Sequence, residues 1–178
     1  MNRPDRLALL FHRRWTVPVL AELHRARGAK FITLTTRLEA SPGAVRAALD
    51  HLQDLGWVAP NPGYGHPLRP EYILTPDGER IAEPCDALDR ALVGLDLRPI
   101  GLRKWSMPTL DVLRAGSARF SEVRAALTGI TDRALSMALG DLLASQLAAR
   151  SLVDGAPPSA RYGPTGRSAR LCSILAEL

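Results

Sequence analysis

The feature that most constrains how this chain can fold is an internal repeat. Residues 13–20 read RRWTVPVL and residues 103–110 read RKWSMPTL, which is an offset of 90 positions. Phe31 and Phe120 continue the match at an offset of 89, after which the offset returns to 90. Such an ordered series of matches indicates two copies of one folding unit, fused head to tail. The later matched pairs are Ser41 and Thr131, Val45 and Leu135, Leu49 and Leu139, Leu52 and Leu142, Trp57 and Leu147, Tyr72 and Tyr162, and Thr75 and Thr165.

Apolar residues at helical spacing predict three helices in the first part of each copy. Hydroxyl side chains suit the N-caps of two of them: Thr33 and Ser121 for the second helix, and Ser41 and Thr131 for the third. A tight connection separates the second helix from the third. The predicted ranges are 14–25 and 104–114 for the first helix, 33–38 and 121–127 for the second, and 42–55 and 132–142 for the third.

Two short strand candidates follow the third helix in each copy, around a loop rich in proline and glycine. Two helices joined by a tight turn and followed by a β-hairpin form a winged helix-turn-helix. We therefore expect a mainly α chain with small β-hairpin wings, made of two winged helix-turn-helix domains at 1–97 and 98–178 that form a pseudo-dimer. The strand candidates lie at 57–59 and 71–74 in the first copy and at 148–153 and 160–162 in the second, and a last helix follows near 76–95 and 166–178.

The net charge of +5 belongs to the second copy. Residues 1–96 contain 12 basic and 12 acidic residues, whereas residues 97–178 contain 11 basic and 6 acidic residues. A basic half favours an anionic partner, usually nucleic acid, although it also serves simple solubility. We therefore expect double-stranded DNA as the partner, contacted mainly through the second half of the chain.

Other classes of function find little support in the sequence. None of the common catalytic fingerprints is present, and the four histidines lack an evident acid–base partner, so we expect no enzyme and no cofactor. Cys85 and Cys172 lack the spacing of a metal site and are expected to be small buried residues in a reducing compartment. No apolar run reaches the length of a membrane span and the N-terminus does not read as a secretory signal, so we expect a cytoplasmic protein.

The second copy carries a series of motifs at residues 103–105 with Leu110, at 119–123, in the turn at 127–131, at Leu135, Leu139 and Leu142, and at 157–162. In this order the motifs resemble those of the HxlR-type branch of the MarR-like winged-helix regulators. The resemblance implies a transcriptional regulator, and it implies that a fused pair would act as a single-chain pseudo-dimer facing an operator, as a monomer or as a further homodimer. In the first copy the wing end at 69–78 (RPEYILTPDG) also resembles the family.

The outer face of the third helix and the wing supply the candidate DNA contacts, because a major groove admits one α-helix. Neither third helix is rich in the side chains that read bases in pairs of hydrogen bonds. We therefore expect either modest base specificity or one module, the first, that has drifted toward a structural or sensing role. Each candidate has a plainer interpretation as a solvated surface residue. The candidates are Arg46 and Arg69 in the first copy, and Arg119, Arg124, Thr131, Arg133, Ser136 and Arg161 in the second.

Two further interpretations stay open. Trp15 and Trp105 either line an effector pocket between the modules or are core residues, as such tryptophans are more often. The weakness of the third helices would also suit a tandem winged-helix scaffold for protein interaction, or a small-molecule sensor with weak or no DNA binding.

Overall fold

The computed structural model describes residues 3–63, 70–153 and 159–178, which form two compact units. The first unit is His12–Arg90, and the second is Ala91–Leu178 together with the N-terminal residues up to Phe11. The helix α1 (Arg3–Leu10) groups with the second unit because it packs on that unit's helix α7. This division differs in two ways from the expected one, which had its boundary between 97 and 98. Helix α1 groups with the second unit, and so does the short segment 91–97.

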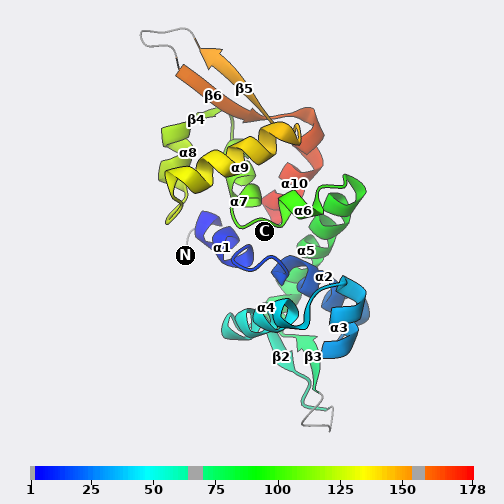
Figure 1. Ribbon diagram of the computed structural model, residues 1–178. Helices are drawn as coiled ribbons and strands as arrows, with labels where there is room; N and C mark the ends of the chain where they lie inside the picture. The colour runs from blue at the N-terminus through cyan, green and yellow to red at the C-terminus, as the bar shows by residue number, and fades with distance from the viewer. Residues whose placement is uncertain (1–2, 64–69, 154–158) are drawn as a thin grey trace. The chain divides into compact units, whose positions relative to one another are not determined.

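The first unit has a helical core and a small sheet at one end (Figure 1). Its three strands are antiparallel in the order β1-β3-β2, and its apolar centre includes Leu20, Leu34, Leu49 and Leu52, none of which is exposed. The elements are α2 (Thr16–Ala26), β1 (Ala29–Lys30), α3 (Phe31–Leu38), α4 (Pro42–Asp54), β2 (Val58–Pro60), β3 (Glu71–Leu74) and α5 (Pro76–Gly94).

The second unit repeats this order of elements. Its sheet has the order β4-β6-β5, and the hairpin of β5 and β6 extends beyond the helices (Figure 1). Leu110, Leu135, Leu142 and Leu171 are buried in its core. The elements after α5 are α6 (Arg98–Gly101), α7 (Ser106–Arg114), β4 (Ala118–Arg119), α8 (Phe120–Ala126), α9 (Asp132–Ala144), β5 (Ala148–Val153), β6 (Ser159–Pro164), η1 (Gly166–Ser168) and α10 (Ala169–Glu177).

Matching hydrogen bonds recur at the junction between the hairpin and the last helix of each unit. The Thr75 hydroxyl donates to the Gly56 carbonyl at 2.7 Å, and the Thr165 hydroxyl donates to the Gln146 carbonyl at 2.6 Å. Each of these threonines also donates its backbone N–H to a carbonyl at the start of the hairpin, at 3.0 Å in one unit and 3.1 Å in the other. Taken over both units, the described chain is mainly helical with small antiparallel sheets, as predicted.

Two details differ from the sequence-based expectations. The second helix of each unit begins earlier than predicted, with Lys30 and Arg119 at the N-cap positions in place of Thr33 and Ser121. The reason is that each N-cap residue ends a two-residue strand, β1 or β4, which pairs with the second strand of the hairpin and was not predicted. No helix among the described residues is long and apolar enough to cross a membrane.

Candidate nucleic-acid interface

The helix α9 is fixed at its N-terminus and along one face. The Thr131 hydroxyl accepts a hydrogen bond from the Ala134 backbone N–H at 3.2 Å, which satisfies one of the free donors of the first turn. Leu135, Leu139 and Leu142 are buried and hold the inner face of the helix in the core. The opposite face of α9 is therefore presented to solvent in one defined orientation.

Arg133 and Ser136 lie on that exposed face, near the N-terminal end of α9. Among the residues that the structure describes, no hydrogen bond or ion pair engages the Arg133 side chain. Both side chains are thus available to a ligand, and the positive end of the helix dipole adds a partial positive charge beside them. An anion or the edge of a base pair could be bound here without breaking an existing contact.

The basic residues of the neighbouring helix are less available. Arg124 of α8 donates to the Asp132 carboxylate at 3.0 Å, and this acidic partner stands at the first turn of α9. Arg119 is exposed, and its backbone N–H donates to the Glu122 carboxylate at 2.7 Å, which closes the first turn of α8. A phosphate group would have to compete with Asp132 for Arg124, whereas Arg119 needs no such exchange with Glu122, which binds only its backbone.

The hairpin of β5 and β6 carries two arginines. Arg161 has partners in the same unit, and Arg150 was not among the predicted DNA contacts. Arg161 of β6 donates to the Ser117 carbonyl at 2.8 Å and lies 3.6 Å from the Glu122 carboxylate, so it joins the hairpin to β4 and α8. Arg150 of β5 is exposed. Its place opposite Tyr162 in the sheet register, together with the predicted strand at 148–153, could have identified it from the sequence.

The third helix of the first unit, α4, offers less to an anion. Ser41 caps it by accepting from the Ala44 N–H at 3.3 Å. The Arg46 guanidinium lies 4.3 Å from the centre of the Phe31 ring and donates to the Tyr72 hydroxyl at 3.1 Å. Arg46 thus stabilises the packing of α4 on β3 and α3. The other candidate of this unit, Arg69, lies outside the described residues.

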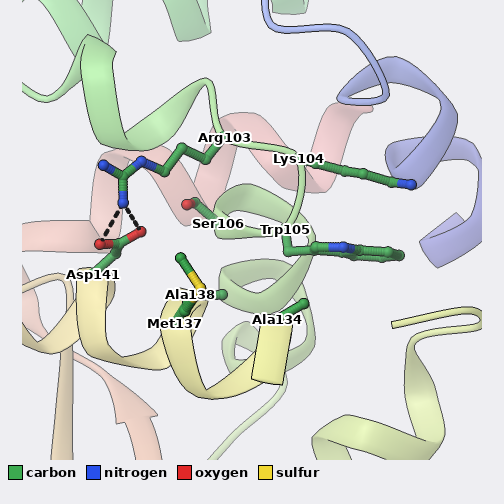
Figure 2. A pocket seen from close by; sticks show the side chains of 8 residues that line it. All are labelled: Arg103, Lys104, Trp105, Ser106, Ala134, Met137, Ala138 and Asp141. Atoms are coloured by element: carbon green, nitrogen blue, oxygen red, sulfur yellow. Dashed lines mark hydrogen bonds and ion pairs between the residues drawn. The ribbon is translucent and has the colours of Figure 1, made fainter. Parts of the chain in front are cut away.

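The two repeat-matched tryptophans sit at equivalent places, immediately before α2 and α7, and both are half-buried. The Arg14 guanidinium is 5.9 Å from the Trp15 ring centre, and the Lys104 ammonium is 4.9 Å from the Trp105 ring centre. Trp105 lines a small pocket against α9, within the second unit (Figure 2). The expectation of an effector pocket at Trp15 and Trp105 stays a prediction.

The two cysteines are free, buried thiols. Burial raises the pKa of Cys85 far above its usual range, and the nearby Asp89 and Asp86 carboxylates raise it further. Burial likewise raises the pKa of Cys172, against a smaller opposing effect of its hydrogen bond with Ser168. Neither residue has the thiolate character that a reactive cysteine needs. Within the residues described, no group of three or more His, Cys, Asp or Glu is placed to hold a metal ion.

Comparison with known families assigns the second part of the chain. Residues 100–178 match the family described as HxlR-like helix-turn-helix, and this range contains every element from α7 to α10. The match lies within the second copy and covers less than half of the chain. No curated protein matches the chain.

Several solved structures are similar to parts of the chain. One is described as a transcriptional regulator of the MarR family from Enterococcus faecalis V583, at 28% identity, with 51% of this chain and 76% of that one covered and a TM-score of 0.41. The others are two forms of YodB from B. subtilis. The reduced form of this transcriptional regulator is 20% identical, with 59% of this chain and 87% of that one covered and a TM-score of 0.41. The diamide-treated form is 19% identical, with 44% of this chain and 78% of that one covered and a TM-score of 0.40.

Proposed function

We propose that this chain is a transcriptional regulator that binds duplex DNA, built as a single-chain pseudo-dimer of two winged-helix modules and contacting DNA mainly through the second. The observation that carries the proposal is the exposed face of α9. Its inner face is fixed by buried leucines, its N-terminus is capped by Thr131, and Arg133 and Ser136 stand unengaged on the outer side within the described residues. The match of residues 100–178 to the HxlR-like helix-turn-helix family supports this assignment.

The two modules differ in how available their arginines are to DNA. In the second module the exposed arginines Arg133 and Arg150 lie on the helix and on the hairpin that would meet the groove and the adjacent backbone. In the first module the arginine of the third helix, Arg46, which matches Ser136 in the repeat, is held by Tyr72 and Phe31. The first module therefore contributes position more than base recognition, and arginine–phosphate contacts of the second contribute most of the affinity.

The test begins with a selection from random duplex DNA by the full chain, followed by fluorescence anisotropy titrations on an enriched duplex. We expect Arg133→Ala with Arg161→Ala to weaken binding by tenfold or more at ~100 mM salt and to lower the salt slope by about 2, since each phosphate contact contributes about 0.9. Because Arg161 also ties β6 to Ser117, the Arg133→Ala single variant is measured separately.

The matched control removes two arginines of the same unit that lie away from α8 and the N-terminus of α9. Arg167→Ala with Arg170→Ala changes residues of η1 and α10, at the far end of the unit from α8 (Figure 1). The control should keep its affinity within about twofold. Equal losses in both double variants would show that net charge, not the α9 face, governs binding, and unchanged titrations for Arg133→Ala would remove this residue from the interface.

A scaffold for protein interaction is the second candidate, and one observation favours it. Leu152 is 72% exposed and Val153 43% exposed on β5, an unusual place for two adjacent large apolar side chains. The scaffold predicts no retention on duplex DNA at ~50 mM salt, and it predicts that Leu152→Ser with Val153→Ser releases a partner that co-purifies with the native chain. Retention on DNA with no such partner would favour the regulator.

A further inference from the structure

The proposed function leaves one acidic side chain on the exposed face of α9 unexplained. Asp132 is the first residue of α9, and its side chain is 79% exposed. Asp132 and Arg133 are both neighbours of Ser136 on the helix surface, at spacings of four and three residues, so the three side chains form one exposed patch. Duplex DNA carries one negative charge for every ~1.7 Å of its length, so a carboxylate in this patch opposes binding unless it has a specific partner there.

A neighbouring arginine orients this carboxylate and offsets its charge. The Nε atom of Arg124, on α8, donates to the Oδ1 atom of Asp132 at 3.0 Å. Among the residues that the structure describes, the second oxygen, Oδ2, has no hydrogen-bond partner. The pair is close to neutral as a whole, it favours one orientation of the carboxylate, and it leaves one oxygen ready to accept a hydrogen bond.

A plainer role for Asp132 is to stabilise the start of the helix, since an acidic residue in the first turn interacts favourably with the helix dipole. The first unit shows that this position does not need a charge. Its repeat-matched residue is Pro42, which begins α4 after the same kind of hydroxyl cap. Arg124 matches Thr35, so the first unit has neither member of the pair. The pair is therefore a property of the basic second module and not of the framework that both units share.

The chemistry of the major groove determines what the Oδ2 atom can bind. An ionised carboxylate only accepts hydrogen bonds, and the exocyclic amines of cytosine and adenine are the only donors among the base edges of this groove. Adenine places its N7 acceptor beside the amine, where it repels a carboxylate, whereas the edge of cytosine carries no acceptor. We propose that Asp132 selects cytosine in the half-site of the second module by accepting a hydrogen bond from the N4 amine. Arg124 acts through Asp132 as a positioning residue.

Arg133 complements this selection. Its guanidinium only donates hydrogen bonds, and guanine offers it two acceptors, O6 and N7. Because Asp132 and Arg133 are adjacent, they meet the same base pair or neighbouring pairs, and a C·G pair presents both the donor and the acceptors that they need. The selection of cytosine rests on the proposed function, and it adds to that function the base that the second module prefers.

The test compares selections from random duplex DNA by the native full chain, by Asp132→Ala and by Asp132→Asn. The native chain should enrich cytosine at one position that Asp132→Ala leaves open to all four bases. Asp132→Asn should move the preference at that position toward adenine, because a carboxamide pairs with both N6 and N7 of adenine. The matched control is Glu177→Gln, which neutralises an exposed carboxylate at the end of α10 and should leave the motif unchanged.

Anisotropy titrations on duplexes that differ only at this position separate the amine from the rest of the base. Thymine in place of cytosine should weaken binding of the native chain about fivefold or more, as a mismatched base pair does, and should change binding of Asp132→Ala by less than about twofold. 5-Methylcytosine keeps the amine and carries the methyl group of thymine, so it should bind within about twofold of cytosine. Equal losses with 5-methylcytosine and thymine would assign the discrimination to the methyl group and overturn the contact.

Arg124→Ala tests the positioning role. Without its partner the Asp132 carboxylate is no longer oriented, so the preference for cytosine over thymine should fall to within about twofold, while the salt slope stays near that of the native chain. If Arg124 instead binds a phosphate, the salt slope should fall by about 0.9 and the preference should stay unchanged. That second result would overturn the positioning role.

The outcomes separate this inference from the function on which it rests. Identical motifs from the native chain and Asp132→Ala overturn the contact with cytosine and keep the DNA-binding function. Urea unfolding checks that each variant is folded, and an Asp132 variant that is less stable but selects the same motif shows that this residue serves only the start of α9. A native chain that enriches no duplex overturns the proposed function and the contact together.

Discussion

At the scale of single residues, side chains of the same type are used in different ways. Six arginines of this chain were expected to reach DNA, yet Arg46, Arg124 and Arg161 each bind a neighbour in the same unit. Arg133 does not, within the described part of the chain. Composition counts these charges equally, and the tertiary contacts decide which of them an anion can reach without displacing a partner.

The thiol of Cys85 gives a prediction at this scale. The unfolded chain ionises its thiols near pH 8.5, whereas burial beside Asp89 and Asp86 keeps the pKa of the folded thiol much higher. The folded state therefore holds a proton that the unfolded state loses, so stability declines as the pH rises above this value. Between pH 9 and pH 10 the contribution of Cys85 should fall by about 1.2 kcal/mol.

Urea unfolding at pH 9 and pH 10 measures this effect. The native chain should lose about 1.2 kcal/mol more over this interval than Cys85→Ala does, whatever the two stabilities are at pH 7. As an independent control, a thiol reagent at pH 8 should label Cys85 only after unfolding. Parallel losses in the two proteins would mean that the thiol ionises equally in both states.

At the scale of elements, the local signals of the sequence identify the third helices correctly. Ser41 and Thr131 cap α4 and α9 as predicted, because a hydroxyl followed by an acceptable first-turn residue acts through neighbouring backbone alone. The strands β1 and β4 carry no such signal, since two residues show no periodicity and depend on partners in the hairpin far along the chain. For the same reason the helices α3 and α8 begin where those strands end, and not at Thr33 and Ser121.

The candidate site shows the same difference between features that local sequence predicts and features that depend on tertiary contacts. The exposed position of Arg133 follows from helical spacing once Leu135 and Leu139 are assigned to the core. The neutralisation of Arg124 by Asp132 and the anchoring of Arg161 on Ser117 depend on tertiary distances that no pattern in the sequence gives. The pocket at Trp105 also depends on how α7 meets α9, and only its tryptophan was identified beforehand.

Two glycines within helices give a prediction about elements. A Cβ at Gly78, in the first turn of α5, would lie 1.9 Å from the Trp57 carbonyl oxygen. That carbonyl accepts the Thr75 backbone N–H at 3.0 Å, which fixes the approach of the hairpin to the helix. Gly78→Ala should therefore destabilise the chain by about 2 kcal/mol, through displacement of the backbone that joins β3 to α5.

Gly140 of α9 is the matched comparison, because a Cβ there meets no atom within 4 Å. Gly140→Ala should stabilise the chain by about 0.5–1 kcal/mol, since alanine loses less backbone entropy in a helix. Urea unfolding of both variants measures the difference. A Gly78→Ala protein as stable as the native chain would show that the junction between hairpin and helix is not tightly packed.

At the scale of the whole molecule, the two units share the order of their elements but not their charge. The repeated order of elements, with the same hydrogen bonds at Thr75 and Thr165, gives each unit the framework to which the proposed function assigns DNA binding. The excess of basic residues is confined to residues 97–178. A protein with equal frameworks and unequal surfaces is suited to a DNA site whose two halves differ.

The last prediction concerns that site. A symmetric dimer of identical modules reads an inverted repeat, with half-sites about 34 Å apart along the duplex. Since this chain carries two different modules, we expect a selection from random duplex DNA to enrich an asymmetric motif, with one well-defined half that the second module reads and one weakly defined half. Sedimentation of the complex should give one chain per duplex at saturation. An enriched palindrome with two chains bound would contradict the single-chain pseudo-dimer and assign each half of the palindrome to the second module of a separate chain.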